Sequence, residues 1–211
     1  MDIKTVVRLV FVGAWFFGAA CAAVGPPKDR IHLYMLEYQA PAPEGLEPVG
    51  AALKVERFTV APAYNSREIV YRDRAYERNA YAYHKWRANP GDLVMQVLTR
   101  DMRQSGLFRA VYPPESTQAS THVLEGRVEE ILEWDHEDTW SGVLTIGVTL
   151  IEKSESDVLG RVLFQRSYRS EKPCTDRNPK ALVEALSLGM EEISRRLLRD
   201  IHSHLAHRGD P

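Results

Sequence analysis

Three histidines near the C-terminus are the first candidates for metal chemistry. His204 and His207 follow His202 at offsets of two and five, whereas helical metal ligands usually stand four residues apart on one face. An acidic run that could bind calcium comprises Glu133, Asp135, His136, Glu137 and Asp138. This run lacks the ligand spacing of a calcium-binding loop and is typical of a solvated hairpin tip. The sequence therefore predicts no metal site, and we expect the histidines at a solvated helix end.

Cys174 is the candidate nucleophile, since a thiol beside a histidine can attack a carbonyl group. Its neighbours Pro173 and Thr175 do not suggest a strained elbow, and no glycine run is present to stabilise an oxyanion. The chain also has no G-x-S-x-G motif, no P-loop and no dinucleotide-binding fingerprint. We therefore expect no catalytic residue and no cofactor, and the protein is predicted not to be an enzyme.

The densest group of interaction-prone side chains lies between residues 64 and 86. Five of the nine tyrosines fall there, with arginines interleaved among them. Aromatic residues mixed with arginine are typical of protein interfaces and of nucleic-acid surfaces. Two interpretations stay open, namely a surface for a partner and an aromatic layer of the core. The candidates for partner docking are Tyr64, Arg67, Tyr71, Tyr83 and Trp86.

Composition narrows the class of protein that could carry these residues. The 211 residues are 44% apolar and carry 27 basic against 29 acidic side chains, for a net charge of −2. This balance is ordinary for a folded domain and gives no electrostatic reason to expect a nucleic-acid partner. Because the chain has only two cysteines, it can build neither a disulfide framework nor a multi-cysteine zinc site.

The first twenty residues have the pattern of a secretory signal peptide. Lys4 and Arg8 precede a short apolar segment, and small residues lead to Cys21. Cys21 stands where the lipidated cysteine of an exported lipoprotein would be, and ordinary cleavage after Ala22 or Ala23 is the competing interpretation. We expect residues 1–20 to be the signal peptide and residues 21–30 to be the lipidated N-terminus and its tether to the membrane.

Hydrophobic periodicity predicts the elements that follow. Apolar alternation indicates an antiparallel hairpin over residues 121–150, which a third strand extends. Asn89-Pro90 and Asn178-Pro179 each signal the start of an amphipathic helix. The expected strands are 31–38, 52–61, 68–72, 79–86, 107–112, 121–134, 140–150 and 158–168, and the expected helices are 90–105 and 179–201.

This order of elements predicts an α/β fold. We expect a single domain over residues 31–205, in which two main helices pack on one face of a mixed β-sheet containing an antiparallel meander. Residues 206–211 are expected to form a disordered tail.

The same central region resembles a known family. The segments are 53–60 (LKVERFTV), 62–64 (PAY), 67–72 (REIVYR) and 83–86 (YHKW), followed by the helix from Pro90 to Met102. Together, behind a signal peptide and a terminal cysteine, they are similar to the auxiliary lipoproteins of ABC-type transporters, of the PqiC type. The meander and the final helix fit the remainder of that family, so the resemblance covers residues 31–205.

The resemblance implies a non-enzymatic lipoprotein of the cell envelope, held at the outer membrane and facing the periplasm. Its partners would be an MCE-domain protein and the permease and ATPase of the same system, which moves lipids or other hydrophobic compounds. Self-association is also implied, because some relatives assemble into rings. Two alternatives stay open: an assembly lipoprotein that supports an outer-membrane β-barrel, and a periplasmic hydrolase with an unrecognised site.

Overall fold

The structure is a computed structural model that describes residues 30–42, 44–136, 139–154 and 157–206. The predicted signal peptide, Cys21, the tether as far as residue 29 and the tail from residue 207 lie outside the described residues. The strands are β1 (His32–Tyr34), β2 (Val49–Val55), β3 (Thr59–Val60), β4 (Glu68–Arg72), β5 (Asn79–Trp86), β6 (Phe108–Tyr112), β7 (His122–His136), β8 (Thr139–Ser154) and β9 (Asp157–Pro173), and the helices are η1 (Pro62–Tyr64), α2 (Pro90–Gln104) and α3 (Pro179–Ala206).

The predicted antiparallel meander is confirmed by β7, β8 and β9. Register runs from His122 opposite Glu152 to His136 opposite Thr139, and β9 pairs with the far edge of β8. Because side chains alternate across a strand, Leu144, Ile146 and Leu150 of β8 point to one face, where each is fully buried. Thr145, Gly147 and Thr149 lie on the opposite face, as their polar character predicts.

Three strands pair one after another with the other edge of β7. β2, β3 and β4 all run parallel to it, opposite residues 122–124, 127–128 and 132–134 respectively. β6 extends the sheet beyond β2, and β5 and then β1 extend it beyond β4. The sheet is therefore mixed, as predicted. The expected single strand 52–61 is instead two, because the chain turns Phe58 into the core between β2 and β3.

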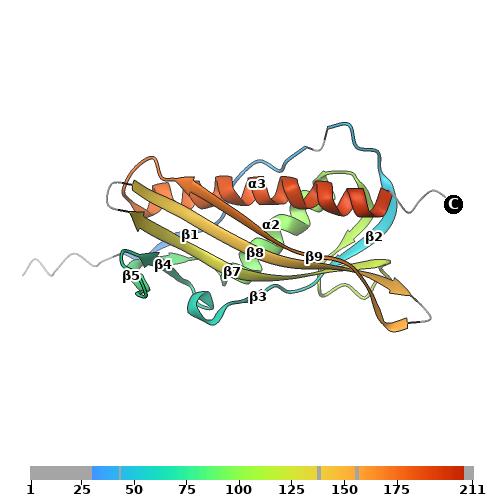
Figure 1. Cartoon of the computed structure of the whole chain (residues 1–211), viewed down its shortest axis with the longest axis horizontal. Helices are drawn as coiled ribbons and strands as arrows, with labels where there is room; N and C mark the ends of the chain where they lie inside the picture. Colours follow the sequence, from blue (N-terminus) through green and yellow to red (C-terminus); the bar gives the residue numbers. More distant parts are fainter. Residues whose placement is uncertain (1–29, 43, 137–138, 155–156, 207–211) are drawn as a thin grey trace, which may run out of the picture. The chain divides into compact units, whose positions relative to one another are not determined.

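Both helices cover the same face of the sheet, the one that carries the buried side chains (Figure 1). Each begins at its predicted asparagine, since Asn89 accepts a hydrogen bond from the amide of Gly91 and Asn178 one from the amide of Ala181, both at 3.0 Å. The predicted α/β class with two packed helices is confirmed. Neither helix in the described part of the chain has an apolar run of the length that crossing a bilayer needs.

Phe58 joins the two layers. A Cβ atom on Gly126 of β7 would lie 2.2 Å from the Phe58 ring, and one on Gly91 of α2 would lie 2.4 Å from the Phe58 carbonyl oxygen. These two glycines therefore leave the space in which Phe58, which is 7% exposed, packs between strand and helix. Glycine is needed at these two positions because any side chain would collide with Phe58, and not because the backbone must be flexible there.

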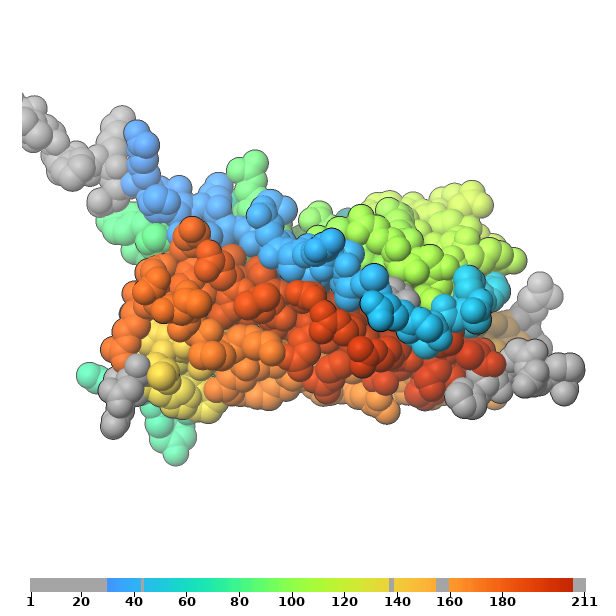
Figure 2. Space-filling view, turned by 90° about the horizontal axis from the view of Figure 1, so that it is seen from above, coloured from blue at the N-terminus to red at the C-terminus, as the bar shows by residue number. Residues whose placement is uncertain are grey.

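The segment between β1 and β2 crosses the helices instead of continuing a strand. The fully buried Asp101 of α2 accepts hydrogen bonds at 2.6 Å from the hydroxyls of Tyr38 and of Ser194 in α3. Arg100 supplies the counter-charge, 2.7 Å from the other carboxylate oxygen. Figure 2 shows the segment, in blue, lying beside α3. The expected strand 31–38 is thus shortened to three residues, because these contacts draw the chain away from β5.

Replacing Gly126 with alanine is predicted to destabilise the protein by about 1–3 kcal/mol, because the added methyl group must displace the Phe58 ring. Urea denaturation measures the change. Gly50→Ala is the matched control, since Gly50 also lies in a strand and a Cβ there would meet nothing within 4 Å. Equal stability of the two variants would contradict this packing.

Candidate functional site

Two of the five predicted docking residues belong to the core. Tyr64 is 5% exposed and Trp86 is 1% exposed, so neither side chain can be the contact surface of a partner. Arg67 is exposed, but its Nε donates to the Trp86 carbonyl at 3.0 Å and its own carbonyl accepts from the Trp86 amide at 2.7 Å. Tyr64 and Trp86 therefore pack in the core, as the aromatic-layer interpretation expects, while Arg67 stays exposed beside them.

Tyr71 and Tyr83, the other two, face opposite sides of the sheet. Tyr71 lies against Tyr81, with ring centroids 5.0 Å apart. Tyr83 is next to His84 on β5 and so points to the other face, where it is 47% exposed. The structure therefore does not bring these two tyrosines together.

Tyr71 instead belongs to a continuous set of rings, which we call the aromatic row. Tyr81 meets the edge of His84 at 5.8 Å, and His84 stacks on His32 at 5.0 Å. The Tyr34 hydroxyl is 2.9 Å from Nδ1 of His84. The row consists of His32, Tyr34, Tyr71, Tyr81 and His84, contributed by β1, β4 and β5, at the left in Figure 1.

Burial keeps His84 and Tyr34 of the aromatic row uncharged at neutral pH. Burial lowers the pKa of His84, and the neighbouring His32 lowers it further, so His84 is neutral at pH 7. Burial raises the pKa of Tyr34, so its hydroxyl keeps its proton. A half-exposed set of aromatic rings on paired strands has the composition of a protein contact surface.

A buried carboxyl group lies beneath the row. Glu133 of β7 is 1% exposed and accepts a hydrogen bond from the Tyr81 hydroxyl at 2.7 Å. Burial, with a smaller effect from Asp135, raises the pKa of Glu133 to about 7. The Tyr81 pKa is raised by burial and by Glu133. This pair fixes the orientation of the ring at the centre of the row.

The residues considered as a catalytic nucleophile or as metal ligands lie in surroundings that do not favour either chemistry. The half-buried Cys174 has a pKa raised to about 11 by burial and by Glu133, so it is a protonated, poor nucleophile at neutral pH. His202 lies 2.8 Å from the Glu47 carbonyl oxygen, and His204 lies 2.8 Å from that of Asp200. Over the described ranges no three ligand-type side chains gather as a metal site; His207, Glu137 and Asp138 lie outside them.

The opposite face of β1 and β5 carries an exposed apolar surface, which we call the apolar strip. Its members are Ile31, Leu33, Met35 and Tyr83, with exposed fractions of 58, 42, 45 and 47%. Strand alternation explains the grouping, because Leu33 of β1 stands level with Lys85 of β5, on the face that Tyr83 shares. Single exposed apolar residues are ordinary, whereas adjacent ones indicate a contact surface.

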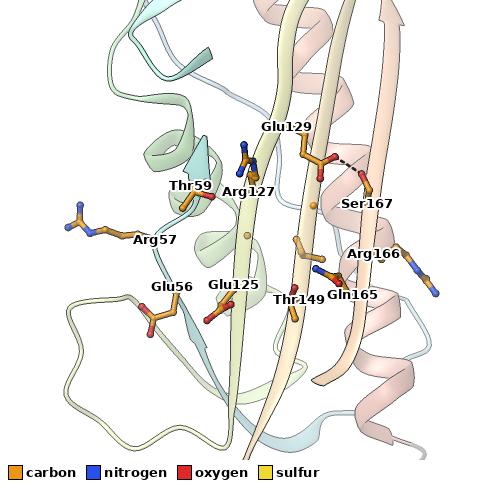
Figure 3. A pocket seen from close by; sticks show the side chains of 13 residues that line it. Glu56, Arg57, Thr59, Glu125, Arg127, Glu129, Thr149, Gln165, Arg166 and Ser167 are labelled. Atoms are coloured by element: carbon orange, nitrogen blue, oxygen red, sulfur yellow. Dashed lines mark hydrogen bonds between the residues drawn. The ribbon is translucent and has the colours of Figure 1, made fainter. Parts of the chain in front are cut away.

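A third surface is the open face of the meander. A hollow of about 760 Å³ lies over Gly147, and a Cβ there would come within 2.5 Å of Glu129 Oε1. Glu129 accepts a hydrogen bond from Ser167 at 2.9 Å (Figure 3). Charged side chains of both signs line the hollow, including Glu125 and Arg127, and its lining contains no histidine or cysteine. This composition does not favour nucleophilic catalysis or an apolar small molecule.

Sequence reasoning identified Tyr71 but missed His32, Tyr34 and His84 as its neighbours. The parallel pairing that places His32 opposite His84 joins strands 52 residues apart, and no local pattern encodes that pairing. Period two separates His84 from Tyr83 by face, but it also groups Tyr81 with Tyr83. The β4–β5 pairing has a register shift, and Tyr81 lies against His84 instead.

Residues 34–197 match the family model of the ABC-type transport auxiliary lipoprotein component. Among solved structures, protein XCC0632 from Xanthomonas campestris is similar with a TM-score of 0.76 and 16% identity, over 85% of this chain and 99% of that one. Protein CT253 from Chlamydia trachomatis has a TM-score of 0.56 and 7% identity, over 76% of this chain and 100% of that one. At these identities the two structures support the fold. No curated protein matches the chain.

Glu133→Gln is predicted to stabilise the protein at pH 8 but not at pH 4. A carboxyl group whose pKa is higher in the folded state binds more protons there, so its contribution to stability is present at low pH and is lost as pH rises from about 4.5 to about 7. At about 1.4 kcal/mol per pH unit, the gain at pH 8 is at most about 3 kcal/mol. Urea denaturation across this range measures it.

The matched control for this substitution is Glu125→Gln, on the exposed face of the same strand. It should leave the pH dependence of stability unchanged. Parallel stability curves for Glu133→Gln and the wild type would show that folding does not raise the pKa of Glu133, against the prediction.

Proposed function

The chain belongs to the family of ABC-type transport auxiliary lipoprotein components, and we propose that it is a non-enzymatic docking subunit of such a transporter. In this proposal Cys21 carries the lipid that holds it at the outer membrane, facing the periplasm. Its partners are an MCE-domain protein and the permease and ATPase of the same system. The system moves lipids or other hydrophobic compounds across the envelope.

The extent of the family match carries this proposal. It runs from Tyr34, the last residue of β1, to Leu197 in α3, so it includes strands β2 to β9, α2 and most of α3. A match of this extent concerns the complete architecture rather than one common supersecondary motif. Transport in such a system consumes ATP in another subunit, consistent with a sequence that has no P-loop.

The environments of the reactive side chains support a binding role over a hydrolytic one. Cys174 is protonated at neutral pH, and the carboxyl group of Glu133 is buried beneath Tyr81. A general base must reach a substrate proton directly or through one water molecule, which a side chain with 1% exposure does not do. Both groups instead hold neighbouring elements in place.

We assign the partner-docking surface to the aromatic row rather than to the whole set identified from the sequence. Tyr71 is retained from that set, and Tyr81 and His84 are added. Aromatic side chains lose little conformational entropy when they bind and often dominate interface energies. The Tyr81–Glu133 hydrogen bond and the strand pairing position the rings before the partner arrives, which reduces the entropic cost of association.

The anchor is tested by isolating the tagged protein from envelope membranes in mild detergent and identifying its N-terminal peptide and companions by mass spectrometry. We expect a lipid-modified Cys21 and an MCE-domain protein or permease. Cys21→Ser should abolish the modification and reduce membrane retention. An unmodified N-terminus after Ala22 or Ala23 without companions would contradict the proposal, and a copurified β-barrel would favour the assembly-lipoprotein alternative.

The docking surface is tested by alanine substitution in the same capture experiment. Tyr71→Ala and His84→Ala should each weaken capture of the MCE-domain partner by about 5–30-fold, the range of a 1–2 kcal/mol interface residue. Their melting temperatures should stay near that of the wild type, because both side chains are half-exposed.

Two controls separate docking from folding. Tyr76→Ala removes a fully exposed tyrosine outside the row and should leave capture unchanged. Trp86→Ala should cost about 3–5 kcal/mol of stability, because it empties a buried site. Normal capture by both Tyr71→Ala and His84→Ala would exclude the aromatic row as the docking surface.

A further inference from the structure

The apolar strip is not explained by the fold or by the aromatic row. Ile31, Leu33 and Met35 alternate with residues of the other face, of which Leu36 is 4% exposed. Of these alternating residues, His32 and Tyr34 belong to the aromatic row and Leu36 lies in the core, while Ile31, Leu33 and Met35 leave their aliphatic side chains exposed to water. Tyr83 extends this surface onto β5. Such a contiguous exposed group is costly to leave uncovered and indicates an apolar or interfacial environment.

The side chains around the strip suit a lipid headgroup region. Lys85 follows Tyr83 on the same face of β5, and Arg87 comes directly after that strand. Glu68 of β4 stands level with Lys85, and Glu37 follows Met35, so the rim carries charges of both signs. Aliphatic residues beside a tyrosine and basic side chains form the composition of protein surfaces that rest on membranes.

The short distance along the chain between the strip and Cys21 favours the membrane as the surface that covers the strip. Ile31 follows Cys21 by ten residues, a length that spans at most about 35 Å when fully extended and far less as a flexible coil. A domain held by a lipid at Cys21 is therefore confined close to the bilayer. At that high local concentration a weak contact suffices to orient the domain.

We propose that the apolar strip rests on the phospholipid bilayer that holds the Cys21 lipid, with Ile31, Leu33, Met35 and Tyr83 at the level of the headgroups. The inference rests on the anchor in the proposed function. The two faces of the β1–β5 pair then have different contacts: the face with His84 and the aromatic row binds the partner protein, and the face with Tyr83 and the strip meets the bilayer. His84 and Tyr83 are neighbours on one strand and therefore point to opposite faces. The membrane thereby orients the row away from the bilayer.

The test uses the complete lipoprotein isolated from envelope membranes and reconstituted into vesicles of phosphatidylethanolamine and phosphatidylglycerol. Hydroxyl-radical labelling read by mass spectrometry reports the accessibility of Tyr83. We compare the wild type with Ile31→Asp/Met35→Asp, whose substitutions flank β1 and so leave its pairing with β5 intact. Labelling of Tyr83 should be severalfold slower in the wild type than in this variant, while Tyr76 should be labelled equally in both.

The matched control is Val162→Asp/Leu188→Asp, which changes two apolar residues of similar exposure, 58% and 57%, outside the strip. It should keep the slow labelling of Tyr83. A melting temperature of Ile31→Asp/Met35→Asp close to that of the wild type establishes that its effect is not unfolding.

The remaining outcomes each decide the question. Equal labelling of Tyr83 in all three proteins, all retained on the vesicles, overturns the membrane contact and leaves the anchor intact. Protection that disappears when the protein is diluted in lipid assigns the strip to a second copy of the chain and also overturns it. A chain that lacks the lipid and does not stay with the vesicles overturns the anchor, and this inference with it.

Discussion

The structure depends on the occupation of both edges of β7. One edge pairs with β8 over almost its whole length, and the other pairs in turn with β2, β3 and β4. A strand so placed is buried along its inner face, where Leu124 and Val128 have no exposed surface. Because β5 and β1 reach the sheet only through β4, the surface they carry is positioned by the register of β7 with β4. The short outer strands could not hold that geometry alone.

The same strand also places a buried acid where it affects the surface. Glu133 stands opposite Tyr71 in the pairing of β7 with β4, and it receives the Tyr81 hydroxyl from β5. Burying a carboxyl group opposes folding at neutral pH. What it provides is a hydrogen bond that, together with the ring contacts to Tyr71 and His84, holds the Tyr81 ring in one orientation. The buried Glu133 therefore lowers the free energy of unfolding at neutral pH, and in return it gives the aromatic row a defined geometry.

The sequence predicted those elements whose signals are local. Asn89 and Asn178 each precede a proline at a helix start, and the alternation from Leu144 to Leu150 predicted a strand with one buried face. The prediction was wrong where a distant group determines the path. Residues 35–38 read as a strand, but Asp101, more than sixty residues away, binds Tyr38 and draws the segment across the helices. The site followed the same division: Tyr71 was identified, but His32 joins the row through its parallel pairing with His84, which no local pattern specifies.

The path of the chain near its start connects the proposed anchor with the core. Any force on a lipid at Cys21 would reach the domain at residue 31 and act first on the short pairing of β1 with β5. Beyond β1, the amide of Glu37 donates to Ser187 at 3.1 Å and Tyr38 donates to Asp101. Asp101 also receives Ser194, so the segment is fastened to both helices at once. Because the strip and the row lie on the two faces of that same β1–β5 pair, strand pairing fixes the position of one surface relative to the other.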